Sequence, residues 1–145
     1  REMGQRFLDL LPGRKTLFPF TIELLEYLTD KGYQLHLITN GFESTQHSKL
    51  KNSGIDKYFQ QVITSEGSNS LKPHKEIFEF AFQKTGAAAA QSIMIGDTLE
   101  VDILGAMNAG IDSVHVNHLN AETGIVNGKK PTYTVFSLEE LVKVF

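Results

Sequence analysis

Five polar residues stand at or just beyond the ends of three apolar segments, and together they offer groups that can hold a phosphate ester and a divalent cation. Thr39 and Asn40 close the first segment, Lys72 follows the second, and Asp97 follows the third, with Asp102 five residues later. The set supplies a hydroxyl, backbone N–H donors, one ammonium and two carboxylates. Carboxylates bind hard cations such as Mg²⁺, whereas the ammonium and the N–H donors hold anionic oxygens. The sequence therefore indicates phosphate chemistry assisted by Mg²⁺.

Each of these features taken alone also has a purely structural explanation. A Thr-Asn-Gly sequence after a strand is commonly just a turn, and a lysine before a proline is commonly a solvated charge beside a helix start. Asp97 follows Gly96 and can serve as a helix N-cap, whereas Asp102 falls inside a predicted helix, where aspartate is a poor helix former. The shared order and common edge of the five residues, rather than any one of them, indicate a site.

Alternating apolar and amphipathic segments predict the framework that brings these residues together. Strands are predicted over 34–39, 61–65, 92–96, 113–117 and 133–136. Helices are predicted over 20–28, 43–52, 73–85, 99–108 and 138–144, with loops over 66–71 and 120–131. Short strands alternating with helices predict an α/β fold with a doubly wound parallel sheet. In such a sheet the carboxyl ends of the strands share one edge, so residues distant in sequence converge there.

Composition narrows the class of protein. The 145 residues are enough for one domain, and the net charge of -3 argues against a nucleic-acid partner, which would need clustered Lys and Arg. The absence of cysteine excludes disulfides and thiolate metal sites and fits a cytoplasmic protein. No apolar run reaches the roughly eighteen residues of a membrane span, so no membrane partner is expected. The chain opens with Arg1 rather than Met, and we expect it to be a piece of a longer protein.

Three strings resemble motifs of the haloacid dehalogenase superfamily in their order and spacing. They are Leu37-Ile38-Thr39-Asn40-Gly41, Leu71-Lys72-Pro73 and Ile95-Gly96-Asp97-Thr98-Leu99-Glu100-Val101-Asp102. The similarity runs from about residue 17 to the C-terminus. The string that continues through Phe42, and the one that continues from Gly96 to Ala106, are particularly similar to bacterial pyrimidine 5′-nucleotidases acting on non-standard nucleotides.

The resemblance implies a role for each residue in a Mg²⁺-dependent phosphohydrolase that works through an aspartyl-phosphate. Thr39 and Lys72 would be catalytic, the first by hydrogen-bonding the transferring phosphoryl group and the second by neutralising its charge. Asp97 would bind Mg²⁺ directly, and Asp102 would bind it through water or orient Lys72 and Asp97. The phosphate-binding and substrate-binding residues would be Thr39, Asn40, Gly41 and Lys72. The expected substrate is a phosphorylated small molecule, specifically a nucleotide.

The chain departs from the family pattern at its N-terminus. Members carry an Asp-x-Asp motif at the end of the central strand, where the first Asp attacks phosphorus and the second is the general acid/base; no Asp-x-Asp occurs here. Residues 1–16 are expected to be a remnant of the helical cap and a linker, and residues 17–145 the C-terminal part of the core. We therefore expect the isolated chain to bind Mg²⁺ poorly and to turn over nothing.

A missing central strand would leave a gap between strands 34–39 and 92–96. These strands could pair directly, accept a strand from a second copy, or associate with an N-terminal fragment. An open gap is the least favoured outcome because unpaired strand edges aggregate.

Three other functions compete with a phosphatase. A 2-haloacid dehalogenase dispenses with the metal, which Asp97 and Asp102 argue against. A receiver-like signalling module also places Asp, Thr and Lys at strand ends, but it does not require an aspartate inside the following helix. A non-catalytic scaffold that has lost its nucleophile is the third.

Overall fold

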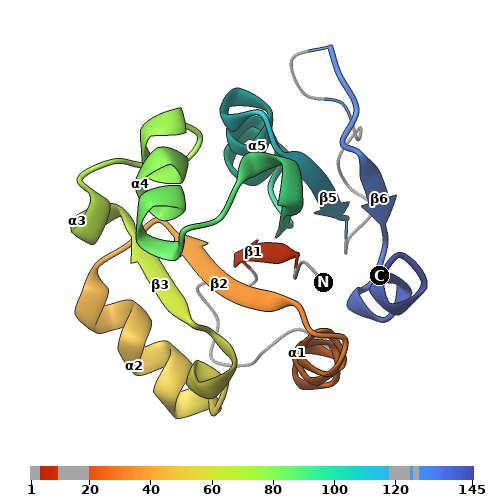
Figure 1. Cartoon of the computed structure of the whole chain (residues 1–145), viewed down its shortest axis with the longest axis horizontal. Helices are drawn as coiled ribbons and strands as arrows, with labels where there is room; N and C mark the ends of the chain where they lie inside the picture. The colour runs from red at the N-terminus through yellow and green to blue at the C-terminus, as the bar shows by residue number, and fades with distance from the viewer. Residues whose placement is uncertain (1–3, 10–19, 118–124, 126–127) are drawn as a thin grey trace.

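A single parallel β-sheet organises the chain. The computed structural model describes residues 4–9, 20–117, 125 and 128–145. The strands are β1 (Gln5–Asp9), β2 (Gln34–Thr39), β3 (Gln61–Thr64), β4 (Ser92–Gly96), β5 (Asp112–Val116) and β6 (Tyr133–Val135). Their order is β3-β2-β1-β4-β5-β6, and every neighbouring pair is parallel (Figure 1). The predicted α/β fold with a doubly wound parallel sheet is confirmed.

Helices lie on both sides of the sheet. The α-helices are α1 (Thr21–Asp30), α2 (Glu43–Ser53), α3 (Ser65–Ser68), α4 (Lys75–Thr85) and α5 (Leu104–Ala109). Short 3₁₀ turns are η1 (Asp56–Tyr58), η2 (Ala89–Gln91) and η4 (Leu138–Lys143), and η3 (Leu99–Ile103) is a π-helix. Figure 1 shows α1 and α2 on one side of the sheet and α4 and α5 on the other.

Two hydrophobic clusters correspond to the two faces of the sheet. Alternate residues of a strand point to opposite faces, and Phe7 and Leu8 of β1 accordingly join different clusters. The cluster containing Leu8 packs strand residues against α1 and η4, and the cluster containing Phe7 packs them against α4, where Ile77 and Phe78 are fully buried. Because both faces are covered, the site residues at the ends of β2 and β4 follow strands that are buried along nearly their whole length.

The strand β1 occupies the centre of the sheet, between β2 and β4, so the open gap that was the least favoured outcome does not occur there. β1 pairs with β2 through Gln5↔Gln34 to Leu8↔Leu37 and with β4 through Gln5↔Ser92 to Asp9↔Gly96. Gln5–Asp9, expected to be part of a remnant of the helical cap, form a strand of this sheet in the structure. The physical reason is that pairing satisfies the backbone N–H and C=O groups along two inner strand edges. The predicted boundary between the cap remnant and the core, at residues 16 and 17, lies outside the described residues.

Several other elements differ locally from the prediction. The helix predicted over 99–108 divides into η3 and α5, and the last predicted helix is the 3₁₀ segment η4. Part of the predicted 66–71 loop is the single helical turn α3. Most of the predicted 120–131 loop lies outside the described residues.

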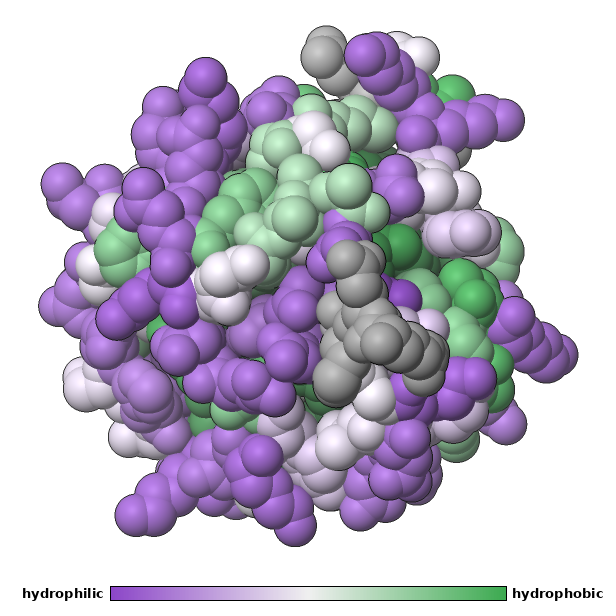
Figure 2. All heavy atoms as spheres, in the orientation of Figure 1, coloured by the Kyte–Doolittle hydropathy of each residue, from purple (hydrophilic) through white to green (hydrophobic). Residues whose placement is uncertain are grey.

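Hydrophilic side chains cover most of the face shown in Figure 2, with a paler, more apolar area over α5. Leu104 and Met107 of this helix are partly buried against the small cluster of Leu99 and Ile103. Large hydrophobic side chains that stand exposed are Ile22, Phe42, Leu71, Ile125, Tyr133 and Phe136. Among the described residues, no helix has the length and apolar character needed to span a membrane.

A buried histidine in β2 makes the stability of the fold pH-dependent. Burial lowers the pKa of His36 to about 4, from the ordinary value of about 6.5. Its Nε2 lies 2.7 Å from Gln5 Oε1, and Nδ1 has no hydrogen-bond partner among the described residues. Between these two pKa values the unfolded chain binds the proton more readily than the folded chain. The free energy of unfolding should therefore fall as the pH drops from about 6.5 to 4, by on the order of 1–2 kcal/mol for this residue.

Urea unfolding at pH 7 and pH 4.5 measures this effect. His36→Gln should show a smaller loss of stability on acidification than the wild-type chain, whereas His47→Gln, which removes an exposed histidine of α2, should lose as much as the wild type. An equal loss in the wild type and His36→Gln would assign the pH dependence to other groups.

Candidate active site

The carboxyl ends of the central strands bring the predicted residues to one edge. β2 ends at Thr39, which is in register with Thr64 at the end of β3. β4 ends at Gly96, immediately before Asp97, and is in register with Asp9 at the end of β1. The backbone of Asp9 thus lies at the edge between Thr39 and Asp97. Sequence reasoning missed this position because it took residues 1–16 to be a remnant of the helical cap and a linker.

Lys72 forms a buried ion pair with Asp102. Its Nζ lies 2.6 Å from Asp102 Oδ1 and donates a second hydrogen bond of 3.0 Å to the carbonyl oxygen of Ile38. Both residues are almost fully buried, at 2% and 1% exposed. A buried charge without a partner is strongly destabilising, so this ion pair fixes a positive group at the strand edge. The structure thus brings these two predicted residues into direct contact.

Asn40 holds the main chain of Lys72 in place. Its amide Nδ2 donates to the Lys72 carbonyl oxygen at 3.2 Å, and its Oδ1 accepts from the Lys72 N–H at 2.9 Å. This paired contact joins the loop after β2 to the loop after β3. The side chain of Asn40 therefore positions Lys72, and its own predicted contact with phosphate would have to come from its backbone N–H.

The π-helix η3 sets the position of Asp102. The backbone N–H of Asp102 bonds to the Thr98 carbonyl at 2.8 Å, and that of Ile103 reaches the same oxygen at 3.4 Å. Asp102 Oδ2 in turn accepts from the Thr98 N–H at 3.3 Å. A Cβ at Gly96 would overlap the Cβ and carboxylate of Asp102. The missing side chain at Gly96 thus lets the carboxylate lie against β4, where Thr98 of this turn donates to Oδ2 and Lys72 donates to Oδ1.

Thr39 and Asp97 complete the edge. Thr39 is buried, and its hydroxyl makes no hydrogen bond with any residue that the structure describes, so it can donate to a ligand. Asp97 is partly exposed, and its Oδ1 lies 3.3 Å from the Thr98 hydroxyl.

The donor set fits Mg²⁺. Within the described ranges no group of three or more His, Cys, Asp or Glu is arranged to hold a metal. Mg²⁺, however, keeps several waters and is commonly bound by one or two carboxylates together with substrate phosphate oxygens. Asp97 has the exposure for direct binding. The Asp102 carboxylate is engaged by Lys72 and Thr98, which favours the orienting role among its two predicted roles.

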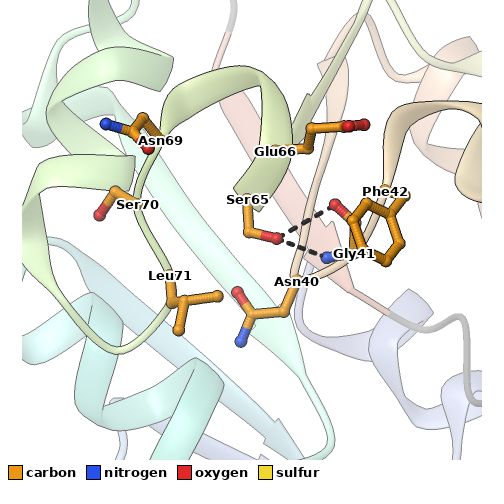
Figure 3. A pocket seen from close by; sticks show the side chains of 8 residues that line it. All are labelled: Asn40, Gly41, Phe42, Ser65, Glu66, Asn69, Ser70 and Leu71. Atoms are coloured by element: carbon orange, nitrogen blue, oxygen red, sulfur yellow. Dashed lines mark hydrogen bonds between the residues drawn. The ribbon is translucent and has the colours of Figure 1, made fainter.

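Ser65 fixes the loop that contains Gly41. Its Oγ accepts from the Gly41 N–H at 2.7 Å and lies 3.0 Å from the Gly41 carbonyl oxygen, as Figure 3 shows. The Gly41 N–H, expected among the phosphate-binding groups, is therefore bonded within the protein. Nothing in the sequence beyond a serine at a strand end pointed to this contact.

Comparison with known proteins identifies the family. Residues 6–116 match the haloacid dehalogenase-like hydrolase family. The chain is 33% identical over 141 residues to pyrimidine 5′-nucleotidase YjjG of Escherichia coli, covering 97% of this chain and 61% of that protein. It is 37% identical over 143 residues to pyrimidine 5′-nucleotidase PynA of Streptococcus pneumoniae, covering 97% and 59%. The structure of YfnB from Bacillus subtilis bound to magnesium has a TM-score of 0.82 and 31% identity, covering 90% and 56%.

The chain spans about three fifths of the length of these curated relatives. The match covers β2 and β4 together with the loops that carry Lys72 and Asp97. By the family match and by these relatives, the chain belongs to the haloacid dehalogenase-like hydrolase family.

Proposed function

We propose that this chain carries the phosphate-binding and metal-binding part of a Mg²⁺-dependent phosphomonoesterase that acts on nucleoside 5′-monophosphates. The observation that carries the proposal is the buried Lys72–Asp102 pair, at the edge of the sheet where β2 ends at Thr39 and β4 ends just before Asp97. The nucleotide substrate is supported by the two relatives named as pyrimidine 5′-nucleotidases, and the metal by the magnesium-bound relative.

The residues divide the work of phosphoryl transfer. Lys72 neutralises the charge on the phosphoryl oxygens and Thr39 donates a hydrogen bond to them, so both stabilise the charge that develops during transfer. Asp102 keeps the ammonium of Lys72 in place. Asp97 would hold Mg²⁺, which when bound polarises a phosphoryl oxygen.

The covalent step requires a carboxylate nucleophile and a general acid. In the proposed reaction a carboxylate oxygen bonds to phosphorus as the bond to the nucleoside O5′ breaks, and a carboxylic acid gives that oxygen its proton. Water then hydrolyses the aspartyl-phosphate to phosphate and the free carboxylate. The chain has no Asp-x-Asp to supply both groups, so we propose that the isolated chain has no turnover.

Hydrolysis assays on two samples test the proposal. The full-length gene product should release phosphate from uridine 5′-monophosphate in the presence of Mg²⁺, with activity lowered about 100-fold or more by Asp97→Asn. The isolated 145-residue chain should not hydrolyse p-nitrophenyl phosphate.

Three results would contradict parts of this proposal. If the isolated chain hydrolyses the ester and Asp97→Asn abolishes this activity, the proposed inactivity of the chain is overturned. If Asp9→Asn by itself also abolishes that activity, the nucleophile would be assigned to the end of β1. Chloride release from 2-chloropropanoate without Mg²⁺ would favour the dehalogenase. A full-length product that binds phosphate but hydrolyses no ester would favour the scaffold.

A further inference from the structure

A pocket of about 600 Å³ opens beside the phosphate-binding residues. It is lined by Asn40, Gly41, Phe42, Ser65, Glu66, Asn69, Ser70 and Leu71. The lining comes from two loops, one after β2 and one after β3. Asn40 lines this pocket and also holds the main chain of Lys72, so the pocket adjoins the candidate active site.

Two of the large hydrophobic side chains that stand exposed lie at this pocket. Phe42 is 67% exposed and Leu71 is 52% exposed. In Figure 3 they lie on either side of Asn40. Phe42 follows the phosphate-binding sequence directly, and Leu71 immediately precedes Lys72. Apolar surface is thus presented on both sides of the group that positions the lysine.

Hydrogen bonds fix the backbone of the loop that carries the Phe42 ring. The preceding residue, Gly41, is bonded through both backbone groups to Ser65, and the Phe42 carbonyl accepts from the Gln46 N–H at 3.0 Å. The next residue, Glu43, donates its N–H to Glu66 Oε1 at 2.8 Å. A side chain held this way by its backbone, yet left exposed, suits contact with a ligand better than a role in the core.

Polar groups form the remaining wall. Glu66, Asn69 and Ser70 offer a carboxylate, an amide and a hydroxyl. A flat heterocyclic ring has two apolar faces and an edge with hydrogen-bonding groups. Its faces suit contact with the aromatic and aliphatic side chains of this pocket, and its edge suits the polar wall.

We infer that this pocket binds the base of the nucleotide, with the ring stacked on Phe42 and packed against Leu71 while its edge meets Glu66, Asn69 and Ser70. The inference rests on the proposed function, because it takes the phosphate of the same molecule to lie at Thr39 and Lys72. It makes Phe42 and Leu71 specificity-determining residues for the leaving group.

A matched pair of substrates tests the inference in the full-length gene product. Uridine 5′-monophosphate and ribose 5-phosphate share the phosphate ester on C5 of ribose and differ in the base. Phe42→Ala should lower the ratio of kcat/KM for the first over the second by about 10-fold, because stacking of a base on an aromatic ring is lost. Leu71→Ser should lower the ratio in the same direction, and Phe42→Tyr should preserve it. Phe136→Ala is the control, since Phe136 is a similarly exposed phenylalanine beyond β6 at the other edge of the sheet.

The outcomes separate this inference from the proposed function. An unchanged ratio in Phe42→Ala, or an equal loss for both substrates, would overturn the base pocket while leaving phosphatase activity intact. If the wild-type protein hydrolyses neither ester, the proposed function fails. Binding of uridine, measured without hydrolysis, then tests whether the pocket binds a base. Saturable NMR shifts at the amides of Phe42 and Leu71 that Phe42→Ala removes would support it, and their absence would overturn it.

Discussion

Replacing Lys72 by methionine is expected to destabilise the fold by about 3–5 kcal/mol and to lower hydrolysis by the full-length protein at least 10²- to 10³-fold. Lys72 Nζ lies 2.6 Å from Asp102 Oδ1, and the two side chains are 0% and 2% exposed. Removing the ammonium takes away the positive charge that forms an ion pair with the buried carboxylate of Asp102. It also removes the positive group that would meet the phosphoryl oxygens.

Urea unfolding of a double-mutant cycle separates these two effects. Asp102→Leu alone should be destabilising because it removes the carboxylate that forms the ion pair with the buried Lys72 ammonium. The double variant Lys72→Met/Asp102→Leu should recover much of the stability, since an ion pair replaced by apolar side chains of similar size is often tolerated. Recovery should be incomplete because the Ile38 carbonyl loses its donor. Hydrolysis should not recover at all.

Lys84→Met is the matched control for this cycle. Lys84 is an exposed lysine of α4, and its replacement should change the free energy of unfolding by no more than about 0.5 kcal/mol. A stability loss in Lys72→Met no larger than in Lys84→Met would show that the buried pair does not stabilise the fold. Restored hydrolysis in the double variant would remove Lys72 from the proposed mechanism.

The sequence allowed the strand-end residues to be found because parallel strands carry strong local signals. The segments 34–39 and 92–96 were predicted with the bounds that β2 and β4 have in the structure. Each is a short β-rich run with a turn signal at its end, Asn40-Gly41 after the first and Gly96 closing the second. Once the strands are parallel, their carboxyl ends must share an edge, and the convergence of Lys72 with Asp102 follows.

Other features depend on contacts between distant side chains, which no local pattern reports. The bonds from Asn40 to the Lys72 backbone, and from Ser65 to Gly41, each join residues more than twenty positions apart.

β1 was missed for a different reason. Gln5–Asp9 has only two adjacent apolar residues, which fit a strand or a helix equally well, and its place is decided by the two strand edges that it pairs with.

Replacing Gly96 by alanine is expected to destabilise the fold by about 2–3 kcal/mol and to lower kcat/KM about 100-fold. Gly96 is not among the described glycines with positive φ, so the reason for glycine here is space rather than backbone conformation. An added Cβ would overlap the side chain of Asp102, whose Oδ1 accepts from Lys72 and whose Oδ2 accepts from the Thr98 N–H. Asp102 would have to move, and the Lys72 ammonium would move with it.

Gly67→Ala is the control for Gly96→Ala, because the Cβ added there also meets a carboxylate. That carboxylate is the tip of Glu43, a partly exposed side chain that can swing aside, so a smaller loss of stability is expected. Thermal unfolding gives the stability, and hydrolysis of uridine 5′-monophosphate and ribose 5-phosphate gives the activity. A displaced Lys72 should slow both substrates by the same factor, whereas loss of the base pocket would slow only the nucleotide. A Gly96→Ala protein with wild-type rates would mean that the position of Asp102 against β4 does not govern the phosphate site.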